Sequence, residues 1–185
     1  GLTGLPAWAQ VKDLNDAINK AGRQRMLSQR IVKAYMALAL QAQPAQAEKI
    51  LSLFDRQLVE SKAFAPSPAI RDTYVKLEGA WSDYKEKLIG KAASLAGAEV
   101  VIAQSETVLA LAHQGTGQLE QASGKPVGQL VNLAGRQRML SQRLAKYSYA
   151  SAGKIAQAAA LTEIGKARTE FLAGMQTLGN APEAT

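Results

Sequence analysis

The chemistry of this chain rests on arginine, because the residues that usually serve catalysis and metal binding are scarce. The 185 residues include no cysteine and a single histidine, His113. Disulfides, thiol nucleophiles and zinc sites built on cysteines or several histidines are therefore excluded. Six of the nine arginines lie in two short segments, 23–30 and 136–143. Guanidinium groups bind oxyanions through paired hydrogen bonds, so anion binding is the chemistry to consider first.

The two arginine segments belong to copies of one decamer. Ala-Gly-Arg-Gln-Arg-Met-Leu-Ser-Gln-Arg at 21–30 recurs unchanged at 134–143, an offset of 113 residues. Asn19 and Lys33 recur at the same offset as Asn132 and Lys146. Core positions accept other apolar side chains at small cost, so packing alone would not keep the polar letters identical. The repeat therefore indicates a shared function rather than two merely similar packing helices.

Positive charge is concentrated around the two copies. The chain has 22 Lys and Arg against 15 Asp and Glu, a net charge of +7. Residues 17–47 and 121–162 contain no acid and contribute +5 and +6, which leaves −4 for the rest. An isoelectric point near 9.7 makes nucleic-acid binding an alternative function. Against nucleic-acid binding, aromatic side chains that could stack on bases are scarce. A role at a membrane surface has less support still, because the basic residues form no continuous cationic face.

Proline and glycine divide the chain into segments of helical periodicity. The pattern predicts six helices, at 13–43, 45–65, 69–93, 98–121, 127–152 and 154–178. The predicted breaks include Pro44, the turn at Pro66–Pro68, Gly97 and Gly153. No segment alternates with period two, and no apolar run reaches the roughly 18 residues of a membrane span. The predicted fold class is all-α, an antiparallel bundle of about six long helices.

The repeat also divides the chain into units. Residues 10–123 form a first repeat, and residues 124–185 form a second, incomplete repeat that packs into the same bundle. Residues 1–9 stand apart. Leu5–Gln10 resembles the cleavage site of a secretory signal, and the alternative is a disordered tail or linker. The signal interpretation predicts an exported, periplasmic protein.

A helical projection at about 100° per residue places one arginine of each decamer on the apolar face. Arg25 falls in the middle of the apolar arc, whereas Arg23 and Arg30 fall on the opposite side. Arg138 takes the corresponding position in the second copy. A buried guanidinium is costly unless a partner compensates it, and arginine cannot escape by losing its proton. Ordinary ion pairs with acids of other helices are one explanation, and the candidates are Glu78, Asp83, Glu99 and Glu106. The protein would then be a purely structural helical bundle without a small-molecule ligand.

The second explanation is a bound anion. Gly22 and Gly135 lie mid-helix, where glycine costs about 1 kcal/mol relative to alanine, and close approach of another backbone would account for both. Two motif helices that cross at these glycines would bring Arg25 and Arg138 face to face. Two facing cations require a shared anion, and the planar fork of arginine suits a small planar oxyanion. The predicted ligand-binding residues are Gly22, Arg25, Gln29, Gly135, Arg138 and Gln142, the glutamines completing the hydrogen bonds.

The pattern Asn-x-Ala-Gly-Arg-Gln-Arg-Met-Leu-Ser-Gln-Arg-x-x-Lys resembles the signature of the PilJ-type sensor domain of type IV pilus chemotaxis transducers. It is also similar to the P-box of bacterial nitrate and nitrite sensor kinases. The resemblance covers about 15 residues in each copy. It implies a periplasmic helical bundle that dimerises and holds one nitrate between paired arginines of two motif helices. The resemblance also implies that the arginine directly before methionine binds the ligand. In this chain that arginine is Arg25 in the first copy and Arg138 in the second.

Carrying both motifs in one chain departs from the single-motif pattern of that family. A monomer could then form the site as an internal pseudo-dimer, and a homodimer is the alternative. The expected function is the binding of nitrate or nitrite by a sensor that acts through a membrane receptor or signalling protein. Neither a cofactor nor a metal is expected, and no enzyme activity, because Ser28 and Ser141 lack a nearby base. His113 is interpreted as a surface or packing residue.

Overall fold

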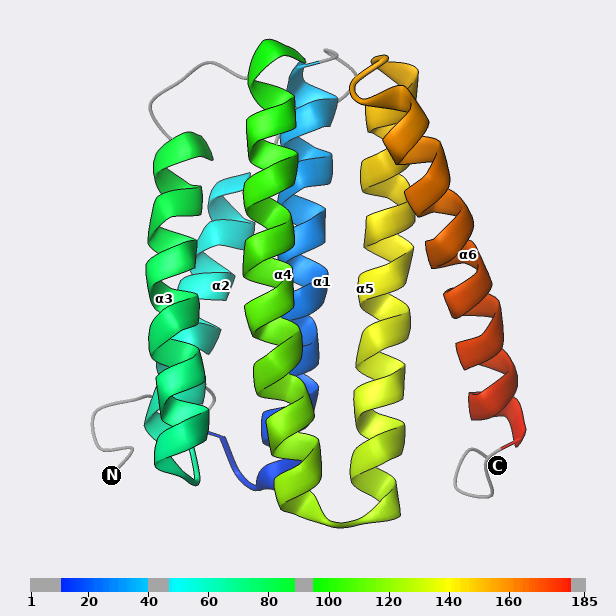
Figure 1. Ribbon diagram of the computed structural model, residues 1–185. Helices are drawn as coiled ribbons and strands as arrows, with labels where there is room; N and C mark the ends of the chain where they lie inside the picture. The colour runs from blue at the N-terminus through cyan, green and yellow to red at the C-terminus, as the bar shows by residue number, and fades with distance from the viewer. Residues whose placement is uncertain (1–10, 40–46, 89–94, 181–185) are drawn as a thin grey trace.

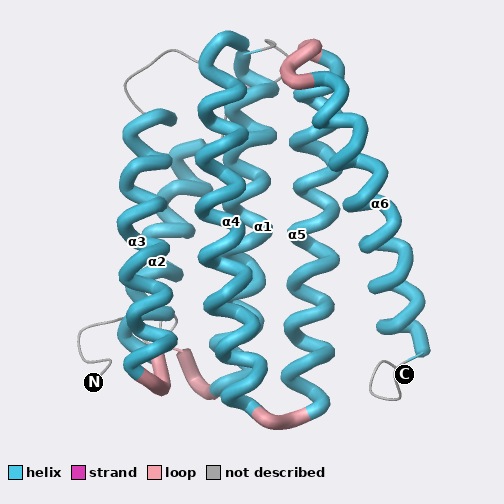
Figure 2. Tube along the Cα trace, viewed as in Figure 1, coloured by secondary structure: helices cyan, strands magenta, loops and turns pink. Residues whose placement is uncertain are grey.

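The computed structural model describes residues 11–39, 47–88 and 95–180. It contains six helices: α1 (Leu14–Ala39), α2 (Ala47–Phe64), α3 (Pro68–Leu88), α4 (Leu95–Ser123), α5 (Pro126–Ala152) and α6 (Gln157–Asn180). None of the described residues lies in a β-strand (Figure 2). The predicted all-α bundle is confirmed.

The helices run alternately up and down, so each lies antiparallel to the one before it (Figure 1). The two helices that carry the decamers, α1 and α5, therefore run parallel to each other, and they form the most extensive helix pair. On one side α4 packs along α1, and α2 and α3 complete that half of the bundle. On the other side α6 packs against α5. Helix α4 packs much more extensively on α1 than on α5, so the two decamers have different surroundings.

Aromatic side chains and one glycine fix the position of α4. Phe54 and Trp81 stack with their ring centroids 3.9 Å apart, and Tyr84 meets Trp81 edge-on at 5.7 Å. These contacts hold α3 against α2. The Tyr74 ring of α3 lies 2.8 Å from the place where a Cβ of Gly115 would stand, so only glycine lets α4 approach this closely. Helix α4 is therefore held firmly where it covers α1.

The predicted break at Gly97 is wrong. Helix α4 begins before this residue and continues through it. A glycine costs a helix only about 1 kcal/mol, which the packing of α4 against α1 and α3 outweighs. The breaks predicted at Pro66–Pro68 and Gly153 are confirmed, because α3 begins at Pro68 and Gly153 caps α5.

Two further predictions concern the ends of the chain and the membrane. Residues 1–9, the signal-like segment Leu5–Gln10 and the break at Pro44 lie outside the described residues. Among the helices that the structure describes, none has a stretch long and apolar enough to cross a membrane.

Candidate functional site

The two motif helices cross at their glycines. Gly22 of α1 and Gly135 of α5 are both buried, and a Cβ placed on either would lie 3.1 Å from the Cα of the other. Each neighbour is rigid backbone, so a methyl group fits there only if a helix moves. The predicted crossing is confirmed. It turns the arginines that follow on each helix toward one place.

Arg25 lies beside this crossing and is 0% exposed. Its Nη1 donates to Nδ1 of His113 on α4 at 3.0 Å. Its Nη2 donates to the backbone oxygen and the side-chain oxygen of Asn132 on α5, at 3.1 and 2.8 Å. The buried Nε has no hydrogen-bond partner. The guanidinium therefore has unused donor capacity inside the bundle.

Within the described part of the chain, no carboxylate lies within ion-pair distance of Arg25. Of the four acids that the sequence offers as partners, Glu78 and Glu106 form ion pairs with other side chains. Burial, followed by the positive charge of Arg136, lowers the pKa of Arg25 to about 10. The group is still charged at neutral pH. Ordinary ion pairing therefore does not account for this buried cation.

Arg138 repeats the arrangement from the other helix. Its Nη2 donates to the side-chain oxygen of Asn19 at 2.8 Å, and this contact corresponds to that of Arg25 with Asn132 at the repeat offset. Arg138 is exposed, so the prediction of a covered position is wrong. The cause is α4, which covers Arg25 through His113, whereas the pocket that Arg138 lines contains no residue of α4. The Nη2 atoms of Arg25 and Arg138 nevertheless lie close to one point. They are 3.3 and 3.8 Å from the place where a Cβ on Gly135 would stand.

The two glutamines of the predicted set form no hydrogen bond with either arginine in the described bundle. Gln29 is buried, and its Nε2 donates to the hydroxyl of Ser28 at 3.2 Å. Gln142 is half-buried and lines a surface pocket together with Arg138. The Oε1 atoms of both glutamines lack a partner. The structure thus brings the two glycines and the two arginines together, and places only Gln142 on the same pocket as one of the arginines.

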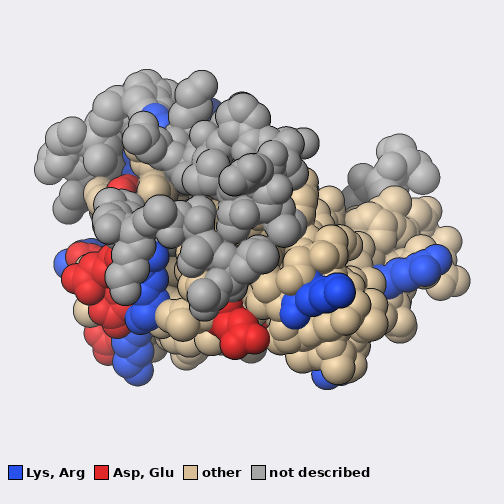
Figure 3. Space-filling model, turned by 90° about the horizontal axis from the view of Figure 1, so that it is seen from above, with Lys and Arg blue, Asp and Glu red and all other residues tan. Residues whose placement is uncertain are grey.

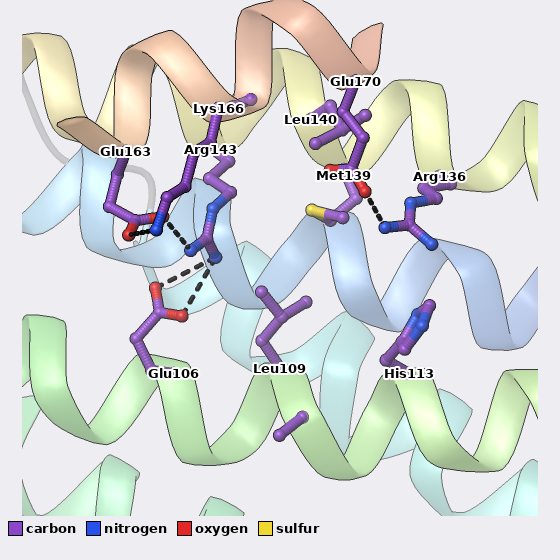
Figure 4. A pocket seen from close by; sticks show the side chains of 12 residues that line it. Glu106, Leu109, His113, Arg136, Met139, Leu140, Arg143, Glu163, Lys166 and Glu170 are labelled. Atoms are coloured by element: carbon purple, nitrogen blue, oxygen red, sulfur yellow. Dashed lines mark hydrogen bonds and ion pairs between the residues drawn. The ribbon is translucent and has the colours of Figure 1, made fainter. Parts of the chain in front are cut away.

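A pocket of about 390 Å³ lies beside the buried arginine, between α4, α5 and α6. Its apolar lining consists of Leu109, Ala110, Met139, Leu140 and Ala167. Figure 4 shows His113 reaching from α4 toward Arg136 of α5, which in turn pairs with Glu170 of α6. One edge of the His113 ring therefore faces the interior at Arg25, and the rest of the ring faces the open pocket.

At the other end of this pocket a cluster of charges ties α4 to α5 and α6. Arg143 donates to both carboxylate oxygens of Glu106 at 3.0 Å and to Glu163 at 3.1 Å. The buried Lys146 donates to Glu106 at 2.6 Å. Burial alone would raise the pKa of Glu106, but Lys146 and Arg143 outweigh burial and lower it. Arg30, which matches Arg143 in the repeat, is exposed, so identical decamers have different surroundings.

The predicted set of ligand-binding residues omits three side chains that hold the arginines. Asn19 and Asn132 recur at the repeat offset, and this recurrence is a signal that could have identified them. His113 has no such signal. It comes from a helix outside the repeated motif, and only the packing of α4 on α1 brings it to Arg25. Its interpretation as a surface or packing residue is therefore incomplete.

The contact with Arg25 predicts an unusual titration of His113. Arginine only donates, so Nδ1 must accept and the ring must be neutral. Burial, and then the charges of Arg25 and Arg136, lower the pKa of His113, while Glu170 opposes them. Because the chain has one histidine, its ring protons titrate alone in an NMR spectrum. We expect a midpoint below the ordinary value of about 6.5.

An anion bound at Arg25 should raise that midpoint. Its negative charge would offset the guanidinium, and the protonated ring would become less costly. The titration should therefore be repeated in saturating nitrate and, as a control for ionic strength, in equal chloride. A midpoint at the ordinary value without nitrate would contradict the observed contact, and an equal shift with both salts would indicate screening.

Comparison with protein-family models gives a match to the family described as PilJ, type IV pili methyl-accepting chemotaxis transducer N-term. The match covers residues 7–114 and 120–182, which is most of the chain, and each segment contains one decamer. No curated protein and no solved structure matches the chain.

Proposed function

This chain belongs to the PilJ family of chemotaxis transducer N-terminal domains, and from that membership we propose that it senses nitrate or nitrite bound between Arg25 and Arg138. Family membership assigns a role in signalling as a sensor-type domain. The identity of the ligand rests on the arginine pair at the crossing of α1 and α5. The two motif helices of one chain supply both arginines, so a single chain has the residues for a complete site.

The observation that carries the proposal is the buried charge of Arg25. A buried cation that lacks its counter-charge is strongly destabilising, typically by 3–5 kcal/mol. In the described bundle only neutral acceptors, on Asn132 and His113, meet this guanidinium directly. A bound anion would supply the missing negative charge, and the free Nε would gain an acceptor.

The crossing favours a small planar anion. The helix backbones are in contact at Gly22 and Gly135, which leaves little room between the two guanidinium groups. A trigonal oxyanion has coplanar oxygens, so each planar guanidinium can bind one edge of it. Sulfate is tetrahedral and carries two charges, so its geometry matches less well and its dehydration costs more. Nitrate and nitrite fit these requirements best.

Nucleic-acid binding has less support from the same features. Arg25 is fully buried, so phosphates of a duplex cannot reach it. Seen from the end of the bundle, basic side chains are either mixed with acidic ones on the α2–α3 side or isolated on the α5–α6 side (Figure 3). The described residues seen at this end offer no continuous positive track for a phosphate backbone.

The family also guides the proposal for location and partner. We place this domain in the periplasm, where the sensor region of a chemotaxis transducer meets small solutes. A membrane receptor or signalling protein would receive the signal. The ion pairs of Glu106 with Arg143 and Lys146 connect α4 to α5, and through this connection a ligand at the crossing would act on more than one helix.

Thermal unfolding in the presence of different anions tests the proposal. A ligand that binds only the folded state, at 100 times its dissociation constant, adds about 2.7 kcal/mol to the free energy of unfolding. For a chain of this size that corresponds to a rise in melting temperature of about 5–11 °C. We expect nitrate to produce this rise and chloride at equal ionic strength to produce much less. Equal rises with nitrate, chloride and sulfate would contradict a specific site.

A further inference from the structure

Resting on the proposed function, we propose that Asn19 and Asn132 occupy the place of the anion in the empty protein and compete with it. Their side-chain oxygens accept from the same guanidinium groups that would bind the ligand. The two asparagines therefore set the affinity of the site and the charge that an occupant must carry.

The contacts are reciprocal across the repeat. Asn132 of α5 accepts from Nη2 of Arg25 on α1, and Asn19 of α1 accepts from Nη2 of Arg138 on α5, both at 2.8 Å. Each motif helix thus carries one arginine and the asparagine that holds the arginine of the other helix. Both bonded Nη2 atoms lie within 4 Å of the Cβ position of Gly135, at the crossing itself. The asparagines therefore use the donors that point to the shared site.

An amide oxygen is a neutral substitute for an anion oxygen. It satisfies the hydrogen bond but brings no negative charge of its own, and this is the state in which Arg25 is found. An anion oxygen adds a charge–charge attraction to this hydrogen bond that the neutral amide oxygen cannot supply. A bound anion would therefore displace the asparagines, at the cost of the bonds they make in the empty state.

Displacement of the Asn132 side chain from Arg25 would also affect a contact with α4. The Nδ2 of Asn132 donates to the carboxylate of Glu120, near the end of α4 that leads into the turn before α5. When the Asn132 side chain leaves Arg25, its position relative to Glu120 changes. The Asn132–Glu120 contact thus connects the proposed anion site with the α4–α5 turn.

Substitutions at Asn19 test the competition, because Arg138 is exposed and no acid among the described residues bonds the Asn19 side chain. N19D places a permanent negative charge against Arg138, and nitrate should then bind at least about tenfold more weakly. N19A removes the competing acceptor, and nitrate should bind about two- to tenfold more tightly, which is the worth of one hydrogen bond. Opposite effects at one position distinguish a competitor from a residue that merely supports the fold.

The controls are N15D and N15A, one turn earlier on α1, where the side chain makes no hydrogen bond with Arg138 in the described structure. Both should leave the dissociation constant for nitrate, measured by calorimetry, within about twofold of the wild type. If the wild type binds nitrate and N19A weakens binding as N19D does, Asn19 is a ligand and the competition is wrong, while the proposed function stands. If the wild type binds no nitrate, the proposed function itself is overturned and the competition with it.

Discussion

Replacing Arg25 with methionine should abolish nitrate binding while the helical bundle stays folded. Losing one charged partner of a desolvated anion typically costs 2–5 kcal/mol, which weakens binding about 30-fold to several thousandfold. Methionine keeps the length and the apolar stem of the arginine. It also removes a buried cation that has no carboxylate partner, so no buried counter-charge is left unpaired. Calorimetric titration with nitrate gives the binding result, and circular dichroism with a melting curve reports on the fold.

The repeat and the helix projection supply matched controls for this substitution. Arg138→Met should weaken binding by a similar order, because Arg138 provides the second guanidinium at the crossing. Arg23 and Arg30 lie on the exposed side of the same helix, and methionine at either should change the affinity by less than about threefold. Equal losses at all four arginines would show that overall positive charge, rather than a defined site, holds the anion.

Alanine at Gly135 should separate the two motif helices and weaken the site at the same time. The new methyl group would stand 3.1 Å from the Cα of Gly22 and 3.3 Å from Nη2 of Arg25. Overpacking of this kind typically costs 1–3 kcal/mol, or about 2–12 °C in melting temperature for a chain of this size. Nitrate should also bind at least about tenfold more weakly, because the guanidinium has to move. Thermal unfolding and calorimetry of the same variant measure both effects.

Other glycines of the chain provide the comparison for Gly135. Gly79 in α3 and Gly165 in α6 lie within helices and have no atom within 4 Å of their Cβ positions. Alanine there should stabilise the protein by up to about 1 kcal/mol, since it favours helix and meets nothing. A Gly135→Ala variant that melts at or above the temperature of Gly165→Ala would contradict the close crossing.

The sequence was sufficient to predict the features that depend on a single helix and its copy. Helical periodicity predicted the bundle, and the position of Arg25 among apolar residues predicted its burial. The unexplained mid-helix glycines predicted the contact of Gly22 with Gly135. Each of these features follows from the direction in which side chains point around one helix axis, together with the condition that the two identical helices meet.

Features that depend on the neighbouring helices could not be predicted in this way. Arg25 and Arg138 occupy identical positions in their decamers, yet one is buried and the other exposed, because α4 covers Arg25 with His113 and contributes nothing to the pocket that Arg138 lines. The same holds for Arg30, which is exposed, and Arg143, which pairs with Glu106. Gln29 shows the limit of a projection. A helical projection gives the direction of a side chain but not its hydrogen-bond partner, and the Gln29 amide donates to the hydroxyl of the adjacent Ser28.

In the proposed site, one chain holds one nitrate between its own two motif helices. Calorimetric titration of the wild-type protein with nitrate, over a range of protein concentrations at which light scattering gives the mass of the monomer, tests it most directly. We expect one nitrate per chain and a dissociation constant that does not depend on protein concentration. Absence of binding by the monomer, or binding that appears only as dimers form, would contradict it.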